Sequence, residues 1–98
     1  MKSEDFRQTL SKELPPAGID APLRALWWDG HGDWEKAHAE VDELETKPAM
    51  MVHAYLHRKH GDASNAAYWY RQTGKPFPTC TLDQESEMLL AEFLQGSE

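Results

Sequence analysis

The sequence predicts an all-α fold in which two antiparallel helical hairpins lie between two flanking helices, about six helices in all. Three observations favour this fold. β-branched residues are scarce, and no segment alternates apolar and polar residues as a half-buried strand does. Apolar residues recur instead at spacings of three and four. The run His31-Gly32-Asp33 returns 29 residues later as His60-Gly61-Asp62, which is typical of stacked helical units.

Residues 1–14 are expected to form the first flanking helix. Ser3 is a suitable N-cap, because its hydroxyl can accept a hydrogen bond from a free backbone N–H in the first turn. Phe6, Leu10 and Leu14 follow at spacings of four and share one apolar face. The two prolines that follow Leu14 end the helix.

Residues 20–78 are expected to hold four helices, paired as two hairpins of equal length. Short connections between successive helices favour antiparallel neighbours. Each helix has a capping aspartate or a first-turn proline at its start, in chain order Asp20, Asp33, Pro48 and Asp62. A last helix over residues 83–95, capped by Asp83, completes a single domain of residues 1–98. The flanking helices would cover the ends of a two-repeat stack.

Residues 20–78 resemble tetratricopeptide and Sel1-like helical repeats. The matching features are a small residue midway along the first helix, a Gly-Asp turn, and an alanine in the second helix. They are carried by Ala25 and Ala54, Gly32-Asp33-Trp34 with Ala37, Gly61-Asp62 with Ala66, Trp69-Tyr70-Arg71 before Gly74, and Pro78. The period of 29 is shorter than the usual ~34 residues of a tetratricopeptide. Residues 52–71 are also similar to small uncharacterised microbial proteins.

The resemblance implies a concave groove lined by the first helix of each hairpin. In the second hairpin the matching positions are Met51, Tyr55, Arg58 and Lys59. Arg58 and Lys59 suit the binding of a carboxylate on an acidic peptide. The main functional hypothesis is therefore a non-enzymatic interaction module that binds a protein or peptide ligand.

The alternative hypothesis is a small metal-binding protein or metal-dependent enzyme. His53 and His57 lie four residues apart, so both imidazoles face one side of a helix. His38 can join them if the hairpins stack, and Glu35 or Asp42 could add a ligand. These three histidines would hold a divalent metal such as zinc. The other interpretation is that His53 and His57 pack against tryptophan and tyrosine rings in the core.

Composition limits the class of partner. The net charge of −7 argues against nucleic acid, which requires a basic face. Acidic residues gather between positions 29 and 45 and basic residues between 51 and 75, which would also allow two copies to pair. The segment around Cys80 has no catalytic motif, and a single cysteine favours a reducing compartment. With neither an apolar leader nor a membrane-spanning run, a cytoplasmic location and no membrane partner are predicted.

Overall fold

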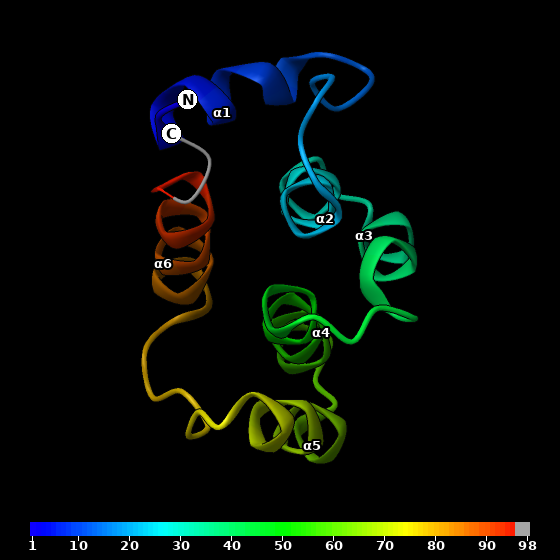
Figure 1. The fold of residues 1–98 in the computed structure, drawn as a ribbon, viewed down its shortest axis with the longest axis vertical. Helices are drawn as coiled ribbons and strands as arrows, with labels where there is room; N and C mark the ends of the chain where they lie inside the picture. Colours follow the sequence, from blue (N-terminus) through cyan, green and yellow to red (C-terminus); the bar gives the residue numbers. More distant parts are fainter. Residues whose placement is uncertain (96–98) are drawn as a thin grey trace.

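The computed structural model describes residues 1–95 and confirms the all-α class, with no strand among those residues. Six α-helices and one short 3-10 helix follow one another within this described part of the chain (Figure 1). Their bounds are α1 Ser3–Gln8, η1 Thr9–Ser11, α2 Ala21–Gly30, α3 Trp34–Val41, α4 Lys47–Lys59, α5 Ala63–Thr73 and α6 Leu82–Gln95.

Consecutive helices pack as pairs, α2 with α3 and α4 with α5, and α3 also contacts α4. The extended segment 74–81 leads from α5 to α6. Helix α6 then packs against α2 and α4 on the side away from α3 (Figure 1). Helix α1 packs against α6. The two flanking helices therefore contact each other, and α6 also contacts α2 and α4.

The two predicted turns have the same backbone geometry. Gly32 and Gly61 have φ values of +91° and +86°, a left-handed conformation that glycine adopts without a Cβ clash. The backbone N–H groups of Asp33 and Asp62 each donate to the carbonyl five residues earlier, at 2.9 Å in both copies. Both aspartate side chains then accept a bond from the N–H three residues later, which confirms them as N-caps.

The core is centred on Trp27 of α2 and on the facing side of α4. Trp27, Val52 and Leu56 have no exposed surface. Four alanines are completely buried where the paired helices approach each other, at positions Ala25, Ala37, Ala54 and Ala66. Burial of these small residues lets the backbones of each pair approach closely.

The first flanking helix is shorter than predicted, because α1 ends at Gln8 and η1 continues only to Ser11. Thr9 accounts for this early end of the helix, since its hydroxyl donates to the carbonyl of Phe6 and accepts the indole N–H of Trp27. Leu14 lies beyond both helices and is 69% exposed, so its predicted place on the apolar face is wrong. Ser3 makes no cap either, because the cap position belongs to Lys2.

The last helix begins one residue earlier than predicted. Thr81 precedes it, and its hydroxyl accepts the N–H of Gln84 while the Gln84 side chain accepts the N–H of Thr81. This reciprocal pair is a capping box, which satisfies two backbone donors at once. Asp83 therefore lies in the first turn rather than at the cap. Within residues 1–95, none of the helices combines the length and the apolar content needed to cross a membrane.

Candidate functional site

Three histidines from two helices converge on one side of the molecule. His38 comes from α3, while His53 and His57 lie one turn apart on α4. One ring nitrogen from each lies within 4.8 Å of the other two. The Nε2 atoms of His38 and His53 are 3.1 Å apart. The structure thus brings together the three histidines that the sequence singled out, which we call the histidine cluster.

The spacing of these nitrogens suits a transition metal. Two nitrogens bound tetrahedrally to zinc at about 2.0–2.1 Å lie about 3.3 Å from each other. The 3.1 Å hydrogen bond between the Nε2 atoms of His38 and His53 is close to that value, and a ring nitrogen of His57 lies within 4.8 Å of the other two. His53 is 4% exposed, and its Nδ1 atom makes no hydrogen bond within residues 1–95. That ring therefore has bonding capacity that the described protein leaves unused.

Two tryptophans hold the rings of the histidine cluster in place. Trp34 stacks on His38 with a centroid distance of 4.9 Å and an angle of 10°. Trp69 stacks on His53 at 4.3 Å and 22°. The indole N–H of Trp34 donates to the carbonyl of Leu56 at 2.8 Å, which anchors that ring to α4. Such packing limits the rotamers of the imidazoles, and ligand preorganisation of this kind favours binding.

The environment lowers the pKa values of two members of the cluster, His53 and His57. Burial lowers the pKa of His53 from its ordinary value of 6.5 to about 4, and the neighbouring His38 and His57 lower it further while Asp42 opposes the shift. Burial also lowers the pKa of His57, again with a contribution from His38. A metal binds the neutral imidazole, so protons compete weakly at these two residues above pH 7.

Glu35 and Asp42 were the two acidic residues expected near the cluster, and of these only Asp42 reaches it. Its Oδ2 atom lies 3.9 Å from Nδ1 of His38, on the side of the ring opposite to Nε2. In metal sites a carboxylate in this place orients the ligating imidazole. Glu35 is exposed on α3 and does not join the three histidines. His60 stacks on Trp34 at 4.2 Å but also lies outside the cluster.

The groove expected on the other side of α4 is covered by α6. Met51 and Tyr55 are 6% and 2% exposed. The hydroxyl of Tyr55 donates to Asp29 at 2.9 Å, and the ammonium of Lys59 donates to the same carboxylate at 2.9 Å. Desolvation and the Asp29 charge both raise the pKa of Tyr55. Binding of a peptide through these residues stays a prediction, and it requires α6 to leave.

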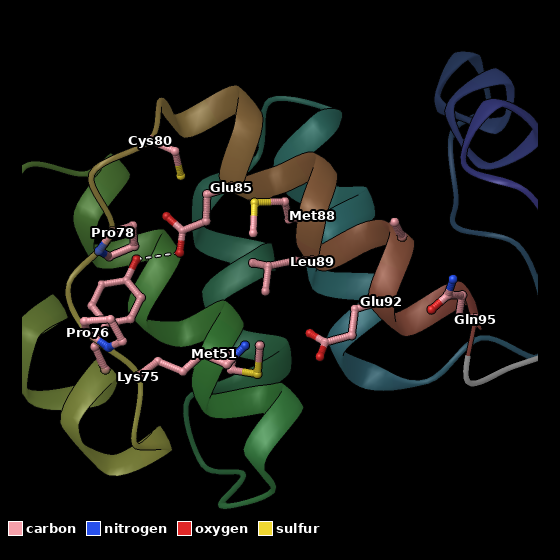
Figure 2. Close-up of a pocket in the computed structure, with 12 residues that line it drawn as sticks. Met51, Lys75, Pro76, Pro78, Cys80, Glu85, Met88, Leu89, Glu92 and Gln95 are labelled. Carbon is pink, nitrogen blue, oxygen red and sulfur yellow. Dashed lines mark hydrogen bonds between the residues drawn. The ribbon is translucent and has the colours of Figure 1, made fainter.

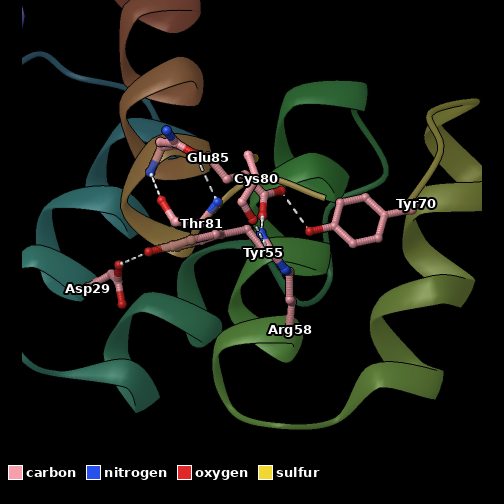
Figure 3. Close-up of polar contacts among 8 residues, drawn as sticks. Asp29, Tyr55, Arg58, Tyr70, Cys80, Thr81 and Glu85 are labelled. Atoms are coloured by element: carbon pink, nitrogen blue, oxygen red, sulfur yellow. Dashed lines mark hydrogen bonds and ion pairs between the residues drawn. The ribbon is translucent and has the colours of Figure 1, made fainter. Parts of the chain in front are cut away.

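Arg58 binds the covering helix rather than an external carboxylate (Figure 3). Its guanidinium donates to Oε1 of Glu85 at 2.7 Å and to the carbonyl of Cys80. The hydroxyl of Tyr70 donates to the second carboxylate oxygen of Glu85 at 2.6 Å. Burial and this bond raise the pKa of Tyr70, while the bond to Glu85 raises the pKa of Arg58. Glu85 thus supplies in the same molecule the carboxylate that was expected from a ligand.

Sequence reasoning missed Glu85 and the bond that Tyr70 makes to it, whereas the stacking of Trp69 on His53 agrees with the interpretation that packs this histidine against aromatic rings. Glu85 precedes Leu89 by four residues, a spacing that puts it on the buried face of α6. That signal was present, but an acid on an apolar face has no evident partner until the helices are placed. No family model matches the chain, and neither the curated proteins nor the solved structures include a significant match.

Proposed function

We propose that this protein binds a divalent transition metal, with zinc as the leading candidate, through His38, His53 and His57. The observation that carries the proposal is the convergence of three ring nitrogens within 4.8 Å, from helices in different pairs. An all-imidazole set favours zinc, copper or nickel over magnesium and calcium, which prefer oxygen ligands.

A metal at this place would join α3 to α4, and so would connect the two helix pairs. Three protein ligands leave one tetrahedral position for water or an external ligand. Asp42 supports the arrangement, because its carboxylate lies 3.9 Å from Nδ1 of His38 and its negative charge favours a proton on that nitrogen, which would leave Nε2 of His38 able to bind a metal. The low pKa of His53 supports it too, since this ligand is already deprotonated at neutral pH.

The proposal is tested with untagged protein that has been treated with a chelator and then titrated with zinc by calorimetry. We expect one zinc per chain and a melting temperature that rises with zinc concentration, because a ligand of the folded state stabilises it. His57→Ala is the informative variant, since His57 is only half-buried and its loss should leave the fold intact. We expect this change to weaken zinc binding about a hundredfold or more.

His60→Ala is the matched control, because His60 lies one turn beyond His57 on the same side and outside the cluster. It should bind zinc like the unmodified protein. Equal zinc affinity in His57→Ala and His60→Ala would show that binding, if any, occurs elsewhere. Absence of saturable zinc binding in the unmodified protein would refute the proposal directly.

A further inference from the structure

A second site lies away from the histidine cluster, between the extended segment 74–81, α6 and α4 (Figure 2). It is a cleft of about 540 Å³. Pockets of about 300–1,000 Å³ are typical of sites for small molecules. The back of the cleft is made by buried parts of Met51, Tyr70 and Leu89, and Met88 lies at its edge with 65% of its surface exposed.

The inner wall of the cleft offers an apolar surface with no free charge. Glu85 reaches this wall, but one carboxylate oxygen is held by Arg58 and the other by Tyr70. The remaining lining is mainly thioether, aliphatic and proline surface, contributed by Met51, Pro76, Pro78, Met88, Leu89 and Ala91. An apolar group can therefore enter without leaving a buried polar atom unpaired.

The charged groups lie at the mouth of the cleft. Lys75 extends from the segment after α5, and Glu92 lies opposite on α6, with their side chains directed toward each other across the opening (Figure 2). Neither Lys75 nor Glu92 has an ion-pair partner among residues 1–95. The cleft thus combines an apolar interior with one unpaired cation and one unpaired anion on opposite sides of its opening.

We propose that this cleft binds a small zwitterion with an apolar body, as found in free apolar amino acids and short apolar peptides. The ligand carboxylate would pair with Lys75 and its ammonium with Glu92, while the apolar body lies against Met51 and Leu89. We choose this ligand class on charge complementarity. A ligand with a single charge would lie close to the like charge of either Lys75 or Glu92 at the mouth of the cleft. This inference is independent of the metal proposal.

The test uses the whole protein, with ¹³C-labelled methionine methyl groups followed by NMR. Met51 and Met88 line the cleft, and Met50 on the same helix serves as an internal control. The probes are L-leucine, the dipeptide Leu-Leu, 4-methylpentanoate, isopentylamine and N-acetyl-leucine amide. We expect L-leucine or Leu-Leu to shift the Met51 and Met88 signals with saturation, and which of the two binds more tightly separates an amino acid from a peptide ligand.

Two charge-removing variants make the test specific. Lys75→Gln and Glu92→Gln should each weaken binding of the zwitterion about fivefold. Lys2→Gln, an exposed change in the chain before α1, should leave binding unchanged. The proposal is overturned if no zwitterion shifts the Met51 and Met88 signals at millimolar concentration. It is also overturned if N-acetyl-leucine amide binds as well as L-leucine, because the two charges would then play no part.

Discussion

Arg58 of α4 and Glu85 of α6 form the ion pair that fixes the last helix over the groove between the two helix pairs. Their N–O distance is 2.7 Å, and the two side chains are only 16% and 9% exposed. Tyr70 occupies the remaining oxygen of Glu85. The carboxylate is thus fully paired, and removal of any one member would leave a buried polar group without its partner.

Glu85→Ala should lower the free energy of unfolding by about 3 kcal/mol, since loss of one member of a buried pair leaves the other charge uncompensated. Urea denaturation measures the change. Glu87→Ala is the matched control, because its ion pair with Arg7 is about half exposed. An exposed pair contributes only about 0–1 kcal/mol. Equal losses in the two variants would contradict the structural role given to Glu85.

The metal-free protein should lose stability as the pH falls from about 6.5 to 4. The folded state holds the pKa of His53 at about 4, whereas the unfolded chain protonates this residue near 6.5. In that window the unfolded state binds the proton first, so unfolding becomes easier as pH decreases. His38 and Asp42 face His53 from the α3 side and His57 faces it from α4. The contribution of His53 reaches at most about 3 kcal/mol.

Urea denaturation at pH values from 7.5 to 4.5 in the presence of a chelator checks this dependence. His53→Gln should flatten the profile, whereas His60→Gln should keep the slope of the unmodified protein. The sign of the change in stability with pH is informative, because a histidine stabilised in its charged form would produce the opposite trend. An unchanged slope in His53→Gln would show that His53 is not the source of the pH dependence.

Asp42→Asn should weaken zinc binding about tenfold without loss of the fold. The carboxylate lies beside Nδ1 of His38, and replacing it weakens the orientation of that ring. Calorimetry on Glu43→Gln supplies the control, since Glu43 is an exposed neighbour outside the cluster. If Asp42→Asn binds zinc like the unmodified protein, Asp42 has no orienting role, although the three-histidine site would still stand.

Gly32→Ala and Gly61→Ala should each destabilise the protein by about 1–2 kcal/mol, because a Cβ disfavours positive φ. Nothing lies within 4 Å of a Cβ at either position, so the cost comes from the backbone alone. Thermal or urea unfolding should show nearly equal losses for the two variants. Clearly unequal losses would mean that the two turns differ in energy despite their equal geometry.

The local elements were predictable because their signals are local. Asp20, Asp33 and Asp62 act as caps as expected, since capping depends on residues within one turn. The convergence of His38 with His53 and His57 was also predictable, because spacing placed two of them on one face and the repeated turns indicated neighbouring helices. The prediction for Leu14 was wrong because the end of α1 depends on the bond between Thr9 and Trp27, which is a contact between two elements.

The position of α6 could not be derived in the same way. Its apolar face predicted burial, but several surfaces of a helical stack could have received it. The deciding contacts join residues about 15 and 27 positions apart, from Tyr70 and Arg58 to Glu85. Such pairings depend on the arrangement of all the helices. The expected groove residues Met51, Tyr55 and Arg58 face α6, and the sequence did not predict that this helix covers them.

The contact between α1 and α6 has a consequence for the order in which the chain becomes structured during synthesis. Helices α2, α3 and α4 each contact their immediate successor, so neighbouring helices can associate as soon as both have been made. Helix α1 must wait for its partner α6 until α2 to α5 have been translated. Until α6 is made, the core cluster that contains Phe6, Leu26 and Met51 lacks the leucines of α6, so the nascent chain exposes apolar surface.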